Sequence, residues 1–185
     1  TYVVEQPTDA RFSAPLDGDA AFWLTANGEA VVPDLLAGWL FIRWIRGAHV
    51  RRAVRWHIGA AGLLDFMVQE DRLRALFDDG RVFTFDALGE RILRVDPLAG
   101  EPAMAGCLVG EHAWLLGARL SIHAILRRQC IAVEPRPDRI VRVGAHVAVF
   151  VDDAGQLARS DGVIVGDLPR GSHDAARAPN GVLGI

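Results

Sequence analysis

Arginine, histidine and tryptophan residues are concentrated between positions 35 and 64, a segment that contains no aspartate or glutamate. Guanidinium groups pair bidentately with planar oxyanions such as carboxylates, sulfates and phosphates. Tryptophan rings offer flat faces on which a sugar or a nucleobase can stack. The candidate ligand-binding residues of this segment are Trp39, Arg43, Trp44, Arg51, Arg55 and His57.

A β-hairpin would have to position these side chains. Apolar and polar residues alternate over 50–58, and a short glycine-containing link joins this run to the apolar run 39–46. Side chains alternate between the two faces of a strand, so Arg51, Arg55 and His57 are expected on one face. Arg43 of the preceding strand joins them on this face if the hairpin register matches.

A basic face of this kind favours an acidic carbohydrate or a carboxylate-bearing protein surface as its partner. The alternative is a solvated face whose arginines pair with the acidic residues of 65–101, with the tryptophans in the core. The position of Trp39, Trp44 and Trp56, in an exposed concave site or in the core, separates the two interpretations.

Two cysteines and two histidines have side chains of the types that bind zinc. They are Cys107, His112, His123 and Cys130. Structural zinc sites normally contain closely spaced cysteine pairs, and these residues do not form such pairs. We therefore interpret them as buried thiols and incidental histidines, and predict neither a metal site nor a cofactor.

Catalytic motifs give no assignment. None of the four serines lies in a Gly-x-Ser-x-Gly sequence. All 20 basic residues are arginines, and the absence of lysine excludes P-loop phosphate binding, Schiff-base catalysis and Ser-x-x-Lys acyl transfer. No catalytic residue is assigned, and an enzyme with an unrecognised site remains open as one interpretation.

The composition indicates a folded chain. With 185 residues, 51% hydrophobic and 23% charged, the chain is long enough for one domain and too apolar for a disordered protein. A net charge of −3, without a recognised nucleic-acid-binding motif, argues against nucleic acid as a partner. No apolar stretch reaches the roughly 18 residues of a membrane-spanning helix. Because no signal-peptide pattern is present, the expected location is the cytoplasm.

Short apolar runs separated by glycine- and proline-containing turns are typical of all-β proteins. We expect a two-sheet β-sandwich of jelly-roll or galactose-binding-like type over 21–168. An extended N-terminal arm is expected at 1–20 and a loosely ordered C-terminal tail at 169–185.

Three stretches are less simple than this pattern. The periodicity of 65–77 and of 115–128 fits a helix or a strand, which leaves room for one short helix. The valine-rich stretch 140–151 is expected to form one buried central strand.

Part of the chain resembles a known family. The residues that carry the resemblance are Leu36-Ala-Gly-Trp-Leu-Phe-Ile-Arg43, Asp79-Gly80-Arg81 and Arg91-Ile-Leu-Arg-Val-Asp-Pro-Leu98. Over 36–116 the chain resembles the β-rich N-terminal segment that precedes the catalytic domain in some bacterial family 2 glycosyltransferases. It departs from them at 59–62, where glycine and alanine replace an acidic, aromatic turn. The resemblance implies a non-catalytic sandwich module linked to polysaccharide handling.

Three classes of function follow. The first is a non-catalytic module that binds a carbohydrate or another anionic glycan. The second is a structural subunit, in a homo- or hetero-oligomer, whose apolar faces pack against other chains. The third is the enzyme with an unrecognised site.

Overall fold

The computed structural model describes residues 23–69, 71–98, 102–152 and 154–168. Its strands form four separate antiparallel sheets of four strands each. In each sheet the strands pair in the order in which they follow one another in the sequence. The arm and tail expected at 1–20 and 169–185 lie outside the described residues.

We call the four sheets blades 1 to 4, in chain order. The strands of blade 1 are β1 (Trp23–Leu24), β2 (Ala30–Leu36), β3 (Trp39–Arg46) and β4 (His49–His57). Those of blade 2 are β5 (Leu63–Val68), β6 (Arg72–Phe77), β7 (Arg81–Asp86) and β8 (Ile92–Pro97). Those of blade 3 are β9 (Ala105–Val109), β10 (His112–Leu116), β11 (Leu120–Ala124) and β12 (Gln129–Val133). Those of blade 4 are β13 (Arg139–Val143), β14 (His146–Val151), β15 (Ala154–Ala158) and β16 (Ile164–Asp167).

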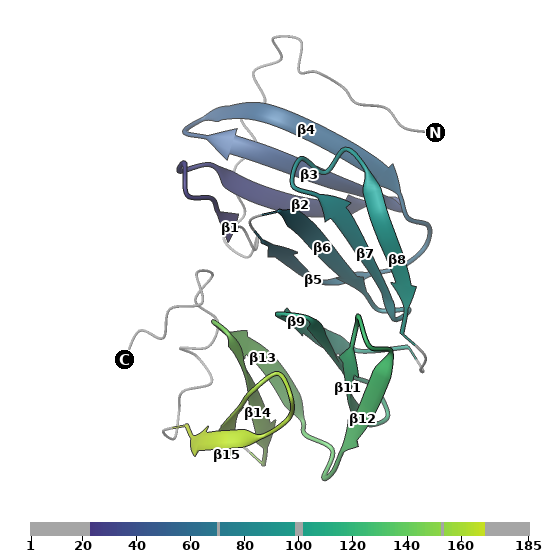
Figure 1. Cartoon of the computed structure of the whole chain (residues 1–185), viewed down its shortest axis with the longest axis vertical. Coiled ribbons are helices and arrows are strands. Elements are labelled where there is room, and N and C mark those ends of the chain that lie inside the picture. Colours follow the sequence, from purple (N-terminus) through teal and green to yellow (C-terminus); the bar gives the residue numbers. More distant parts are fainter. Residues whose placement is uncertain (1–22, 70, 99–101, 153, 169–185) are drawn as a thin grey trace.

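The blades are arranged around a common centre. Figure 1 shows blades 1 and 2 in one half of the molecule and blades 3 and 4 in the other. The first strands of blades 2, 3 and 4 lie side by side, since β9 contacts both β5 and β13. Successive four-stranded meanders placed in this way are the blades of a β-propeller. The expected two-sheet sandwich is therefore wrong, although the all-β content is as expected.

The hydrophobic core is divided into layers between successive blades. Strands β3 and β4, including Trp44, pack against phenylalanines of β6 and β7. The opposite face of blade 2, including Leu76, packs against Leu108 of blade 3. In the third layer, Trp114 of blade 3 packs with Val147 of blade 4. Each blade thus contributes to a shared core, and a single sheet could not bury its apolar side chains alone.

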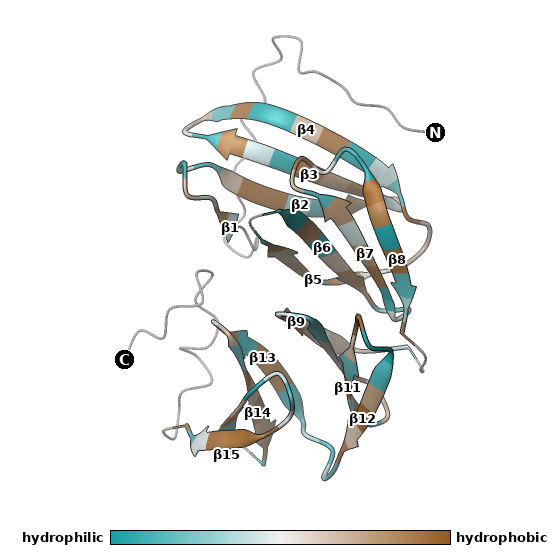
Figure 2. Ribbon diagram, viewed as in Figure 1, coloured by the Kyte–Doolittle hydropathy of each residue, from teal (hydrophilic) through white to brown (hydrophobic). Residues whose placement is uncertain are grey.

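Burial along a strand depends on how many of its faces are covered by other blades. In β6, between blades 1 and 3, five of six residues are buried. In β3 and β4, buried residues alternate with half-buried or exposed ones, and β4 is banded teal and brown in Figure 2. This alternation also occurs in a sandwich, so the pattern of one strand does not distinguish the two folds.

The stretches with ambiguous periodicity all form strands. Residues 65–77 include most of β5 and all of β6, and residues 115–128 include the end of β10 and all of β11. The single strand expected over 140–151 is instead the hairpin of β13 and β14. Gly144 has a φ of 59° in the turn, a left-handed conformation that glycine adopts readily.

Candidate functional site

Four of the six predicted ligand-binding residues share one face of blade 1. The β3–β4 hairpin pairs Trp39 with His57 and Phe41 with Arg55, as the alternation predicts. Arg43 Nη2 donates a hydrogen bond to Asp34 Oδ2 at 2.7 Å. We call Trp39, Arg43, Arg55 and His57 the basic face; it lies opposite the side of blade 1 that packs on blade 2.

The basic face is held together by contacts within the blade. The Arg55 guanidinium lies 5.3 Å from the centre of the Trp39 ring. The Trp39 and His57 rings meet edge to face with centroids 5.0 Å apart. These contacts, with the Arg43–Asp34 ion pair, stabilise the face without a bound anion. Whether it binds a ligand stays a prediction.

Of the other two predicted residues, Trp44 lies on the opposite side of blade 1, and Arg51 lies at an irregularity of the hairpin. Trp44 is in the core between blades 1 and 2, 6% exposed, and is not available as a stacking surface. A β-bulge between Trp44 and Ile45 leaves Arg51 without a cross-strand partner, and Arg51 is exposed. Arg52 contacts the core instead, 5.2 Å from the Trp44 ring centre and ion-paired with Glu90. A bulge changes the alternation of side chains, and the sequence carries no clear signal for it.

A second cluster of polar groups lies at the centre of the blades. Arg142 of β13 forms an ion pair with Asp65 of β5 at 3.0 Å, and its guanidinium lies 4.4 Å from the centre of the Trp23 ring. Asp65 also accepts hydrogen bonds from the backbone amides of Leu108, at 2.7 Å, and Phe66, at 2.8 Å. We call Arg142 and Asp65 the axial pair; their contacts connect all four blades.

Burial decides the protonation of groups near this centre. It raises the pKa of Asp65 to about 6, although Arg142 and the two backbone amides oppose the change. The carboxyl is therefore largely ionised at neutral pH and paired with Arg142. Burial also raises the pKa of the Cys107 thiol. A thiol of this kind is a poor nucleophile and a poor metal ligand.

The four residues considered for zinc lie on different faces of blade 3. Cys107 packs in the layer shared with blade 4. His123 lies on the opposite face, where its Nε2 is 3.0 Å from Ser121 Oγ and 3.7 Å from Cys130 Sγ. Burial, with Arg119 nearby, lowers the pKa of His123. The described residues contain no group of three metal-ligating side chains.

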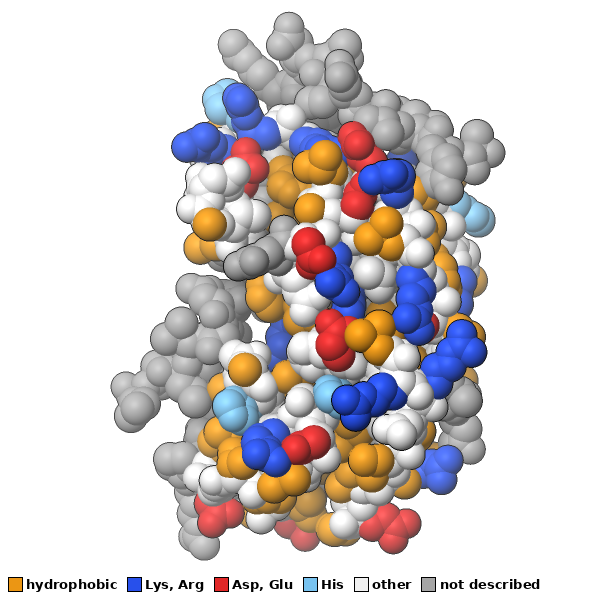
Figure 3. Space-filling view, in the orientation of Figure 1, with side chains coloured by type: hydrophobic (Ala, Val, Ile, Leu, Met, Phe, Trp, Pro, Cys, Tyr) orange, Lys and Arg blue, Asp and Glu red, His pale blue; other side chains and the backbone are white. Residues whose placement is uncertain are grey.

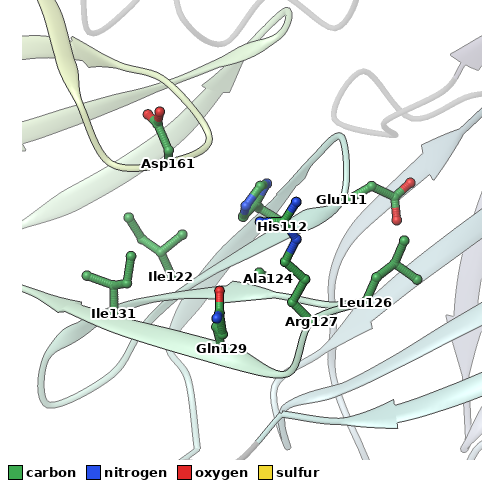
Figure 4. Close-up of a pocket in the computed structure, with 9 residues that line it drawn as sticks. All are labelled: Glu111, His112, Ile122, Ala124, Leu126, Arg127, Gln129, Ile131 and Asp161. Atoms are coloured by element: carbon green, nitrogen blue, oxygen red, sulfur yellow. The ribbon is translucent and has the colours of Figure 1, made fainter.

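A groove lies between the outer parts of blades 3 and 4. It has a volume of about 470 Å³. Figure 4 shows that its floor comes from strands of blade 3, whereas Asp161 comes from the β15–β16 turn of blade 4. The lining residues are Glu111, His112, Ile122, Ala124, Leu126, Arg127, Gln129, Ile131 and Asp161. Residues paired across neighbouring antiparallel strands form two rows in the floor: His112–Ala124–Gln129 and Ile122–Ile131.

Exposed apolar side chains surround this groove. Leu126 is 53% exposed and Ile131 is 55% exposed. Ile164 of β16, 46% exposed, pairs with Ala158 of the core layer between blades 3 and 4. Directly paired residues share a face of the sheet, so Ile164 lies on the same side as the groove. The two outermost strands thus bring apolar residues toward one hollow.

The acidic residues of the groove are neutralised within the chain. Glu111 forms an ion pair with Arg74, whose side chain is 1% exposed. Asp161 forms an ion pair with Arg159. The backbone amide of Val163 and the Arg159 guanidinium hold the pKa of Asp161 below its ordinary value.

The arginines at one end of the groove differ from its acidic residues. Arg127 lines the groove, and Arg128 follows it in the β11–β12 turn; both are exposed. Within the described ranges neither forms an ion pair. Sequence reasoning did not single out this pair. The signal that could have found it is a double arginine between two apolar strands.

At the level of sequence, no relative of this chain is found. No protein-family model and no curated protein matches the chain. The resemblance to glycosyltransferase N-terminal segments therefore stays a prediction, apart from the sandwich it implied. In the described part of the chain, no helix has the length and apolarity needed to cross a membrane.

Solved structures share the fold at low sequence identity. The N-terminal domain of Nup159 has a TM-score of 0.56 and 11% identity, over 88% of this chain and 48% of that one. BBS1N in complex with ARL6DN has a TM-score of 0.55 and 16% identity, over 80% of this chain and 53% of that one. The glutaminyl cyclase of Myxococcus xanthus has a TM-score of 0.50 and 14% identity, over 80% of this chain and 70% of that one.

These matches correct the expected fold. The similarity to Nup159 supports a β-propeller-like arrangement of blades and overturns the carbohydrate-binding jelly roll expected from sequence. The chain spans about half the length of the Nup159 and BBS1N chains, 48% and 53% respectively. At such low identities the comparisons establish the fold and not the function.

Proposed function

We propose that this chain is a protein-interaction unit of a larger assembly, and that a protein partner binds at the groove between blades 3 and 4. The observation that carries the proposal is the exposure of Leu126 and Ile131 in the lining of one hollow, with exposed Ile164 on the side of blade 4 that faces blade 3. Single exposed apolar residues are ordinary on a protein surface. Several that gather around a concave site are typical of interaction surfaces.

The similar structures support an interaction role without deciding it. BBS1N is described in complex with ARL6DN, so a related fold takes a protein partner there. The glutaminyl cyclase shows that the same fold also serves an enzyme. Since one fold hosts different functions, the groove has to carry the proposal.

The basic face of blade 1 is a weaker basis for a partner site. Arg43 is already paired with Asp34, and the Arg55 guanidinium stacks on Trp39. A partner would have to compete with these contacts. On the face that Figure 3 views, positive and negative side chains are interspersed.

Site-specific crosslinking tests the proposal. A photoreactive amino acid is placed at position 131 and, as a matched control, at position 93. Leu93 is 55% exposed, as Ile131 is, and lies on β8, the outermost strand of blade 2. In extracts of the cells that produce the protein, we expect a discrete protein adduct from position 131 and none from position 93.

Competition makes this experiment specific. Excess unlabelled wild-type protein should abolish the adduct at position 131, whereas excess Ile131→Asp should not. Leu93→Asp should compete as well as wild type does. Equal adducts from both positions, or full competition by Ile131→Asp, would show that the groove is not the partner site.

A further inference from the structure

We infer that the groove takes an extended peptide segment of the partner, apolar at alternate positions and acidic at its C-terminal end, which adds as an antiparallel strand to the outer edge of β12. The inference rests on the proposed function and names the class of segment that the partner presents. Three features of the groove carry it: an open strand edge, a partly apolar floor and an unbalanced pair of arginines.

The open edge belongs to β12. This strand pairs with β11 on one side and is the outermost strand of blade 3. The first four of its five residues are exposed. An edge strand directs backbone N–H and C=O groups of alternate residues away from the sheet. Peptides that bind by strand addition use these groups for affinity and neighbouring pockets for specificity.

The floor of the groove selects apolar side chains at alternate positions. An added strand extends the rows that end at Gln129 and Ile131, whose side chains point into the hollow in Figure 4. Alternate side chains of the added strand therefore point the same way. There they cover Ile131 and approach Ile164, which are 55% and 46% exposed. A Cβ added at Gly162 would lie 2.8 Å from Ile122 Cδ1. The turn of blade 4 therefore packs closely on the floor beside Ile122.

The charges at the groove select an acidic end. Arg127 and Arg128 lie just before β12, and an antiparallel strand added to β12 places its C-terminal end beside them. Carboxylates at that end pair with guanidinium groups that lack an acidic partner in the described structure. Glu111 and Asp161 repel these carboxylates only weakly, because they are already paired with Arg74 and Arg159.

Synthetic peptides test the inference directly. The probe alternates isoleucine and threonine over five positions and ends in two glutamates. One control ends in two lysines, and a second carries N-methyl groups on the amides that would face β12. By fluorescence anisotropy, we expect the lysine peptide to bind wild type at least about tenfold more weakly than the probe does, since attraction to the two arginines becomes repulsion. The N-methylated peptide should not bind.

Variants of the protein locate the interaction. Arg127→Glu/Arg128→Glu should weaken binding of the probe about tenfold and strengthen binding of the lysine peptide. The matched control is Arg46→Glu/Arg51→Glu, which reverses two exposed arginines in the blade 1 hairpin and should leave both affinities unchanged. If the first variant fails to fold, as judged by circular dichroism, Arg127→Gln/Arg128→Gln replaces it and should weaken probe binding severalfold.

The outcomes separate this inference from the proposed function. Equal binding of the N-methylated peptide would overturn strand addition, and equal binding of the lysine peptide would overturn the acidic end. A position 131 adduct without any peptide binding would overturn this inference alone. Absence of that adduct would overturn the proposed function itself.

Discussion

The arginines at the axis and those at the rim differ in what neutralises them. At the axis, Arg142 lies between Asp65, the Trp23 ring and backbone carbonyl groups. At the rim, Arg127 and Arg128 are exposed, with no acidic partner among the described residues. An arginine of the first kind holds blades together, because it is largely enclosed, with its side chain 20% exposed, and removing its partners would leave a poorly solvated charge unpaired. Arginines of the second kind contribute little to stability and can pair with another molecule.

The largest effect is expected at the axis. Arg142→Met removes the partner of Asp65, the contact with the Trp23 ring and hydrogen bonds to two backbone carbonyl groups, and should lower the free energy of unfolding by about 3 kcal/mol at neutral pH. Urea unfolding followed by tryptophan fluorescence measures it. Arg127→Met is the matched control and should change the value by less than about 0.5 kcal/mol. Equal losses in both variants would remove the distinction between axis and rim.

Asp65 should make stability depend on pH in the acidic range. Its pKa is raised in the folded protein to about 6 from 3.8, so between these values the folded state binds more protons than the unfolded state. Its contribution to stability is therefore present at about pH 4 and lost as pH rises through 6. The free energy of unfolding of wild type minus that of Asp65→Asn, measured by urea unfolding at each pH, should fall by up to about 3 kcal/mol between pH 4 and pH 6.

The comparison with Asp65→Asn isolates this carboxyl. The lowered pKa of His123 has the opposite effect, because its contribution is lost as pH falls below about 6.5. Since His123 is present in both proteins, its effect cancels in the difference. A difference that rises with pH would mean that Arg142, rather than burial, controls the protonation of Asp65.

A smaller effect is expected at Arg74, which lies between the two extremes. Its side chain is 1% exposed and donates a hydrogen bond to the Gly110 carbonyl at 2.7 Å, yet its partner Glu111 is on the groove. Arg74→Met should lower the free energy of unfolding by about 1–3 kcal/mol, because it removes charge-assisted hydrogen bonds. It should also leave Glu111 unpaired and weaken binding of the acidic peptide. An unchanged peptide affinity would show that neutralisation of Glu111 is not needed.

The smallest effect is expected at the rim itself. Ile131→Asp should leave the free energy of unfolding within about 0.5 kcal/mol of wild type, since the side chain is 55% exposed. Thermal unfolding of Ile131→Asp and Leu93→Asp, measured side by side, checks this. A large loss for Ile131→Asp alone would mean that the rim is part of the folded core.

Local patterns in the sequence predict strands and hairpins but not how sheets pack. The alternation over 50–58 correctly predicts the hairpin of β3 and β4 and the shared face of Arg55 and His57. The same alternation is compatible with a sandwich and with a propeller. The choice depends on which sheet covers each face, and residues far apart in the sequence decide that.

The candidate site shows the same limit. Whether an arginine is available to a partner depends on its neighbours in space, and these are distant in sequence. Arg142 reaches Phe66 of blade 2, 76 positions away, whereas Arg127 meets no acidic residue of the described chain. Composition shows only that both are arginines. Sequence reasoning therefore concentrated on the arginine-rich hairpin of blade 1 and missed the rim of blade 3.

The long reach of Arg142 also bears on how the chain folds. In a repeat array whose units touch only their neighbours, units can form and unravel one at a time. Here the Asp65 carboxyl in blade 2 is neutralised only after blade 3 and the first strand of blade 4 have been synthesised. Contacts of such high sequence separation slow folding, because loop-closure entropy is lost before the contact forms. The axial pair thus links the folding of blade 2 to that of blade 4.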